Sequence, residues 1–212
     1  MNLLFKAKQR IEFFGDSITD ADHQLPAYQP LGQGYVRHIY NLLQAGYPEL
    51  NLEIINRGIS EDQITNLLVR YEKDVLKVNP DWLFIYIGIN DSWRHLEEKE
   101  EDAAALQAFQ NNYRALIEKI RSETGAKLRL VSPFLAEKDR SDPFHQTLTH
   151  YQAIIDCLGE ELEITVIHLQ RAFDWAMLSR SSVFWSTDRV HPTDEGHMLI
   201  ALTLLRACGF RL

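Results

Sequence analysis

Five short apolar runs are spaced along the chain, and longer segments with helical periodicity lie between them. The runs cover residues 10–14, 52–56, 82–87, 127–131 and 164–169. Continuous apolar character is typical of parallel strands that are buried on both faces. One helical segment carries apolar side chains every three or four residues, at Phe109, Tyr113, Leu116, Ile117 and Ile120. This alternation predicts right-handed crossovers, and therefore a three-layer α/β/α sandwich around a five-stranded parallel sheet.

Two helix boundaries can also be predicted. The last helix is expected to begin near Thr193 and to end at Gly209, a residue suited to a left-handed cap. Its inward side chains are expected to be Met198, Leu199, Leu202 and Leu205. The acidic stretch 97–102 is expected to be the solvated start of another helix, because carboxylates suit the positive end of the helix dipole.

The composition indicates one globular domain over residues 1–212, since 45% of the residues are hydrophobic and no Pro-, Gly- or Ser-rich linker divides the chain. A formal charge of −8 argues against nucleic acid as a partner and favours a neutral substrate. No segment has the length of a signal peptide or a membrane span, so we expect a cytoplasmic protein without a membrane partner. Cys157 and Cys208 lie in apolar stretches and are expected to be small core residues.

Polar residues follow three of the predicted strands directly, where active groups gather in parallel sheets. The first strand leads into Gly15-Asp16-Ser17, the second into Asn56-Arg57-Gly58, and the third into Gly88-Ile89-Asn90-Asp91. Ser17 would begin a helix, whose free N–H groups can stabilise an oxyanion that forms beside its hydroxyl. The Gly58 backbone and the Asn90 side-chain amide would add two more donors to this oxyanion hole. Asp16 and Asp91 are expected to hold these loops by hydrogen bonds to backbone N–H groups.

A general base for Ser17 is expected near the end of the chain. Pro192 excludes His191 from the right-handed helical region, so its ring is held in an extended segment before the last helix. Asp188, three residues earlier, can reach the imidazole Nδ1, fix its tautomer and stabilise the imidazolium. Ser17, His191 and Asp188 therefore predict a catalytic triad.

Together these segments resemble the sequence blocks of the SGNH or GDSL family of serine hydrolases. The blocks are Gly15-Asp16-Ser17-Ile18, the segment centred on Gly58, Gly88-Ile89-Asn90-Asp91 and Asp188-Arg189-Val190-His191. The resemblance implies a flavodoxin-like fold, Ser17 as nucleophile, His191 as base and Asp188 as its partner. It also implies Ser17 N–H, Gly58 N–H and the Asn90 amide as oxyanion donors, and neither a cofactor nor a metal. The G-x-S-x-G elbow of α/β-hydrolases is absent.

Within this family, the chain is most similar to cytoplasmic acetylxylan esterases, through residues 31–36, 81–94 and 188–200. That resemblance implies an acetylated small-molecule or oligosaccharide substrate, and it is compatible with a homo-oligomer. Trp93, Arg94 and Trp185 are candidate substrate-binding residues. Thr187 stands where a tryptophan is expected before the aspartate, with Trp185 three residues before Asp188, which leaves the exact substrate open.

The same residues allow other interpretations than a triad. Asp188, His191, Glu195 and His197 could suggest a metal site, but their spacing matches no common zinc pattern. His197 is expected to be a packed or hydrogen-bonded histidine. A lysophospholipase or thioesterase would need an apolar groove, whereas the loop 20–34 is mostly polar. A non-catalytic sugar-binding protein is disfavoured because both Ser17 and His191 are retained.

Overall fold

A computed structural model describes residues 3–98 and 102–211 of the protein. Its sheet is parallel throughout, with the strand order β2-β1-β3-β4-β5. The strands are β1 (Arg10–Gly15), β2 (Glu53–Gly58), β3 (Trp82–Tyr86), β4 (Lys127–Ser132) and β5 (Val166–His168). The predicted α/β class and five strands are confirmed. The fifth is shorter than the predicted run 164–169: it begins only at Val166, and helix α7 begins directly at Leu169.

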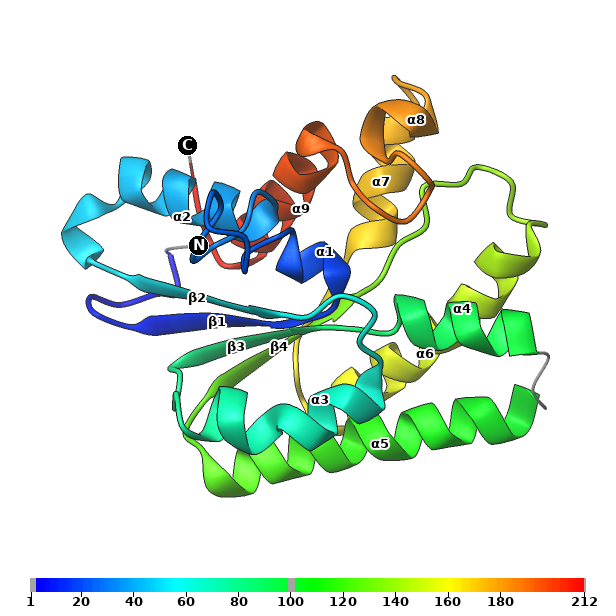
Figure 1. The fold of residues 1–212 in the computed structure, drawn as a ribbon, viewed down its shortest axis with the longest axis horizontal. Helices are drawn as coiled ribbons and strands as arrows, with labels where there is room; N and C mark the ends of the chain where they lie inside the picture. The colour runs from blue at the N-terminus through cyan, green and yellow to red at the C-terminus, as the bar shows by residue number, and fades with distance from the viewer. Residues whose placement is uncertain (1–2, 99–101, 212) are drawn as a thin grey trace.

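Helices cover both faces of the sheet (Figure 1). The α-helices are α1 (Ser17–Asp20), α2 (Tyr35–Gly46), α3 (Ile64–Tyr71), α4 (Ile89–Glu98), α5 (Asp102–Glu123), α6 (Pro143–Glu161), α7 (Leu169–Met177), α8 (Ser182–Trp185) and α9 (Asp194–Ala207). A 3-10 turn η1 (Pro48–Leu50) precedes β2, and a π-helical turn η2 (Glu72–Leu76) extends α3. Within the described ranges, no helix is long and apolar enough to cross a membrane.

Two apolar cores separate the three layers. One lies between the sheet and the helices α2, α7 and α9, and the other lies under α3, α5 and α6 (Figure 1). In β1, Ile11 and Phe13 enter the first core and Phe14 enters the second. Burial on both faces explains why the strands have continuous apolar runs instead of alternating ones. The stripe predicted from Phe109 to Ile120 is confirmed, since it is buried in the second core.

The last helix has the predicted ends but not the predicted face. Thr193 is the N-cap of α9 and donates its N–H to Trp185 O at 3.1 Å, and Gly209 has φ of 83° just beyond the helix. Leu205 is buried as predicted, but Met198, Leu199 and Leu202 are only partly buried. The attachment of Thr193 fixes the rotation of the first turn, which directs other residues inward. These are Ile200, Ala201 and Leu204.

Two smaller predictions need correction. Of the acidic stretch, Glu97 and Glu98 are exposed in the last turn of α4, residues 99–101 lie outside the described residues, and only Asp102 stands at the start of a helix, α5. Cys208 is buried as expected, whereas Cys157 is exposed on α6, where that helix faces away from the core.

Candidate active site

The carboxyl end of β1 carries Ser17 at the first position of α1. The preceding residue, Asp16, caps this helix, because its Oδ1 accepts the Ile18 N–H at 3.0 Å. Asp16 is fully buried, and burial raises its pKa to about 7. Asp91 acts similarly at the start of α4 by accepting the Ile64 N–H at 3.1 Å. Both aspartates therefore hold the loops as predicted. Since α1 spans only four residues, it offers local N–H groups and little dipole.

Ser17, His191 and Asp188 meet in a continuous hydrogen-bonded chain. The distance from Ser17 Oγ to His191 Nε2 is 3.0 Å, and that from His191 Nδ1 to Asp188 Oδ2 is 2.7 Å. Asp188 Oδ1 also accepts the backbone N–H groups of Val190 at 3.0 Å and His191 at 2.7 Å. Partial burial alone would raise the pKa of Asp188, but these hydrogen bonds lower it. The carboxylate therefore stays ionised beside the imidazole, as an acid that orients a base must.

The segment that carries His191 is a tight loop before α9. His191 O accepts the Thr187 N–H at 3.0 Å and the Ser186 hydroxyl at 2.9 Å. Arg189, at φ of 77°, donates from its guanidinium to Asp142 Oδ2 at 2.9 Å. These contacts fix the loop against neighbouring segments, so the position of the His191 ring does not depend on Pro192 alone.

Two of the predicted oxyanion donors, Ser17 and Asn90, each have an N–H to offer. The Ser17 N–H is at the first position of a helix, where backbone N–H groups have no intrahelical partner. Asn90 Nδ2 donates one hydrogen to Asp62 O at 2.9 Å, and an amide has a second hydrogen to offer. Asp62 is itself held by Arg70 Nε at 2.7 Å, and Arg70 also donates to Gly15 O at 2.9 Å. Sequence reasoning missed this support from Arg70, because it joins two distant segments.

The prediction for Gly58 needs correction. Its buried N–H already donates to Asn56 Oδ1 at 2.9 Å, so this hydrogen is not directed to a substrate. Gly58 instead allows α1 to pack closely, since a Cβ there would lie 2.0 Å from Asp20 N. The Asn56 amide completes this contact by donating to Thr19 O at 2.7 Å and Leu31 O at 3.0 Å. In the sequence, the one sign of this role of Asn56 is that a polar residue stands near the end of a buried strand.

A cavity of about 420 Å³ opens beside Ser17. It is lined by Ser17, Ile18, Ala21, Asp22, Gln33, Ser60, His191, Pro192, Asp194 and His197. Sequence reasoning noted that the loop 20–34 is polar, but it did not single out Asp22 or Gln33. His197 is hydrogen-bonded, as expected, because its Nδ1 accepts the Tyr35 N–H at 3.2 Å.

The three aromatic and basic candidates are not among the described residues that line this cavity. Trp93 packs edge-to-face on Phe144, with ring centroids 5.0 Å apart. Arg94 lines a separate cavity of about 280 Å³ beside α3 and α5. Trp185 is half-buried and packs on the core, next to the ring of Phe184. These contacts depend on how the helices pack, which the sequence did not reveal, and they place the three side chains outside the lining of the cavity beside Ser17.

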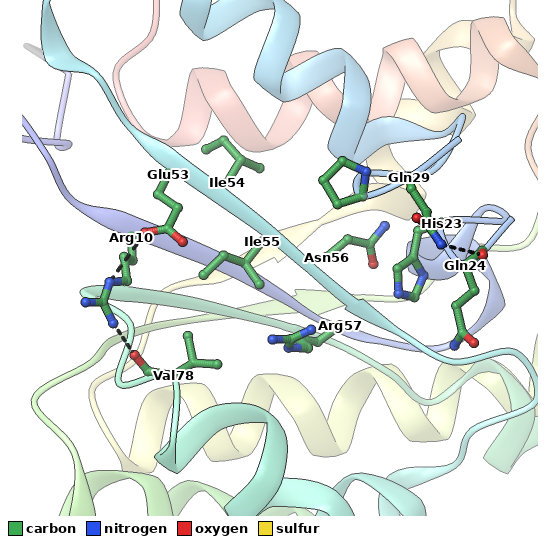
Figure 2. A pocket seen from close by; sticks show the side chains of 11 residues that line it. Arg10, His23, Gln24, Gln29, Glu53, Ile54, Ile55, Asn56, Arg57 and Val78 are labelled. Carbon is green, nitrogen blue, oxygen red and sulfur yellow. Dashed lines mark hydrogen bonds and ion pairs between the residues drawn. The ribbon is translucent and has the colours of Figure 1, made fainter. Parts of the chain in front are cut away.

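A larger cavity, about 640 Å³, lies along the outer edge of β2 (Figure 2). Figure 2 shows Arg10 donating to Val78 O beside Glu53, and Gln29 donating to Gln24 O at the other end. None of the triad residues lines it. Size alone therefore does not identify the site. In the described part of the chain, no three His, Cys, Asp or Glu side chains gather as metal ligands would.

A parallel sheet with a serine after one of its strands, linked by hydrogen bonds to a histidine and an aspartate, is the architecture of a serine hydrolase. The chain belongs to the GDSL-like lipase/acylhydrolase family, which matches residues 13–199. It is 35% identical to the acetylxylan esterase of Geobacillus stearothermophilus over 208 residues, covering 95% of this chain and 94% of the relative.

The fold also matches solved structures. The crystal structure of Axe2, an acetylxylan esterase from Geobacillus stearothermophilus, aligns with a TM-score of 0.90 at 32% identity, covering 99% of this chain and 98% of that one. Other structures of Axe2 are described as catalytic mutants, in which a serine, an aspartate or a histidine is replaced by alanine. LAE5, an alpha/beta hydrolase from the metagenome of Lake Arreo, aligns with the same TM-score at 27% identity, covering 98% of each chain.

Proposed function

We propose that this protein is a serine esterase that removes acetyl groups from acetylated xylo-oligosaccharides. The hydrogen-bonded chain from Ser17 through His191 to Asp188 carries the proposal. The similarity to acetylxylan esterases over nearly the whole chain supports the choice of substrate. The cavity beside Ser17 agrees with a neutral, hydroxyl-rich substrate, since its described lining includes Asp22, Gln33 and Asp194 but no lysine or arginine.

The reaction proceeds through an acyl-enzyme. Ser17 Oγ attacks the acetyl carbonyl carbon while His191 Nε2 takes the hydroxyl proton, and Asp188 stabilises the imidazolium. The oxyanion receives hydrogen bonds from the Ser17 N–H and the free hydrogen of the Asn90 amide. When this tetrahedral intermediate collapses, the bond between the acetyl carbon and the sugar oxygen breaks, and the sugar hydroxyl leaves with the proton from His191. Water, activated by His191, then releases acetate and restores Ser17.

We also place the enzyme in the cytoplasm, in agreement with free thiols at Cys157 and Cys208, because reducing compartments keep cysteines unpaired. Assembly into a homo-oligomer, which the resemblance to acetylxylan esterases suggested, stays a prediction that gel filtration with light scattering will test.

A series of esters with acyl chains of increasing length tests the proposal. An acetyl-selective site is closed behind the carbonyl carbon, whereas an open groove gains roughly 0.8 kcal/mol for each buried CH₂. We expect kcat/KM to be highest for acetyl, to fall through propionyl and butyryl, and to be negligible for octanoyl. Acetylated xylo-oligosaccharides are expected among the better substrates. Their hydrolysis should continue in the presence of EDTA, because a serine mechanism needs no metal ion. Rates that increase with chain length would identify a lipid or thioester hydrolase instead.

A further inference from the structure

His197 lies in the first turn of α9 and is clamped along one edge of its ring. Its Nδ1 accepts the Tyr35 N–H at 3.2 Å, and its ring stacks on the Tyr35 ring at 6.4 Å between centroids. The backbone at Gly34 packs so closely on the same edge that a Cβ would lie 2.7 Å from Cε1 and 2.9 Å from Nδ1 of His197. His197 also lines the cavity beside Ser17. Since the clamp occupies the Nδ1–Cε1 edge, Nε2 is the ring nitrogen left for that cavity.

The clamp determines which nitrogen carries the hydrogen. A nitrogen that accepts a backbone N–H is unprotonated, so the neutral ring of His197 bears its hydrogen on Nε2. Burial lowers the pKa of His197 to about 4, and the charges of His38 on α2 and His191 in the preceding loop lower it too, against the opposing effect of Asp194. The ring of His197 therefore stays neutral well above pH 4.

The other polar groups of the cavity complement such a donor. Asp22 Oδ2 accepts the Gln33 amide at 2.6 Å, and Asp194 Oδ1 lies 2.9 Å from His38 Nε2. Each carboxylate has capacity for further hydrogen bonds. Asp22 and Asp194 can therefore accept from a sugar hydroxyl, whereas His197 Nε2 can only donate.

We propose that the His197 Nε2–H is a fixed hydrogen-bond donor to a hydroxyl of the bound oligosaccharide, and so a substrate-binding residue distinct from the base His191. This inference rests on the deacetylase function proposed above. Since a p-nitrophenyl acetate molecule has no sugar hydroxyl, His197 should favour acetylated xylo-oligosaccharides over that small ester. The measured quantity is the ratio of kcat/KM for the two substrates.

Two substitutions separate the two ring nitrogens. In His197→Asn, the side-chain oxygen can replace Nδ1 and accept the Tyr35 N–H. This shorter side chain has no donor that reaches the position of the Nε2–H. The amide of His197→Gln can replace the Nε2–H. Because a neutral hydrogen bond contributes about 0.5–1.5 kcal/mol, we expect the ratio to fall about three- to tenfold in His197→Asn, through KM, and to stay within about twofold in His197→Gln. His150→Asn, an exposed histidine on α6, is the matched control.

The outcomes distinguish this inference from the proposed function. An unchanged ratio in His197→Asn, or an equal loss on both substrates, would overturn the role of His197. Wild-type protein that hydrolyses p-nitrophenyl acetate but no acetylated xylo-oligosaccharide would overturn the deacetylase function instead. If His197→Asn does not fold, nitrogen NMR of the wild-type ring decides. We expect the Nε2–H tautomer and a shift of its signal on adding xylotriose; the opposite tautomer, or no shift, contradicts the inference.

Discussion

His191 Nε2 lies 3.0 Å from Ser17 Oγ although 174 positions separate the two residues in the chain. His191 lies in the loop before the last helix, and Ser17 follows the end of β1. Their contact exists only because the sheet order places β1 near its centre, with α9 packed over one face (Figure 1). The site is therefore a product of the fold and is not contained in either segment alone.

Asp188→Asn tests the orienting acid. The side chains of Asp188 and His191 are 54% and 52% exposed, so water screens this pair more than it would a buried one. Loss of the Asp188 charge still leaves the His191 imidazolium without its partner. It also permits the tautomer that carries its hydrogen on Nε2, which cannot accept the Ser17 proton. We expect kcat to fall by about 10² to 10⁴, with an unchanged melting temperature. A kcat close to that of the wild type would show that Asp188 does not act through His191.

Asn90→Ala tests the oxyanion hole. The connection from Arg70 through Asp62 to Asn90 holds the amide before substrate arrives, so the amide serves the developing charge without reorganising. We expect kcat to fall about 10² to 10³-fold with a much smaller change in KM. The opposite pattern, a higher KM at constant kcat, would make Asn90 a binding residue.

Gly58→Ala tests the close packing of α1 on β2. An added Cβ would meet backbone atoms of Asp20 and Thr19 at 2.0 to 2.6 Å, so α1 must move together with Ser17. We expect a loss of about 1–3 kcal/mol in the free energy of unfolding, and lower activity. The matched control is Gly125→Ala, where an added Cβ meets nothing within 4 Å. Equal stability of the two variants in urea denaturation would refute this role of Gly58.

A buried carboxyl in β1 predicts a pH dependence of stability. Neither oxygen of Glu12 has a hydrogen-bond partner among the described residues, and burial raises its pKa from 4.5 to about 8. Between these values the folded state keeps a proton that the unfolded state has lost. The contribution of Glu12 to stability is therefore greatest below pH 4.5 and decreases as the pH rises to about 8, by a few kcal/mol on the order-of-magnitude scale.

Glu12→Gln should remove this dependence, because the amide does not ionise. We expect the variant to gain in melting temperature relative to the wild type as the pH is raised from about 5 to about 8. Asp16 and Asp91, whose pKa values burial also raises, are present in both proteins and cancel in the comparison. A difference that does not vary with pH would mean that Glu12 is not the titrating group.

The sequence predicted those features that depend on local pattern. The apolar run that leads into Gly15, the helix start near Thr193 and the three-residue spacing from Asp188 to His191 are all visible within a few residues. Two details escaped the sequence pattern. Asn56 Oδ1, two residues before Gly58, accepts the Gly58 N–H, and Arg94 lines a cavity that it shares with distant residues of α3 and α5. The rotation of α9 depends likewise on its contact with Trp185.

The turnover of Ser17→Ala is the most direct test that Ser17 is the nucleophile. The substitution removes one hydroxyl of a partly buried residue, so the variant should fold with the melting temperature of the wild type. Another serine of the same cavity, Ser60, whose hydroxyl donates to Asp20 at 2.9 Å, provides the comparison. We predict that kcat for p-nitrophenyl acetate falls by roughly three or more orders of magnitude in Ser17→Ala and by less than about tenfold in Ser60→Ala. Near-normal hydrolysis by a folded Ser17→Ala variant would contradict the serine mechanism.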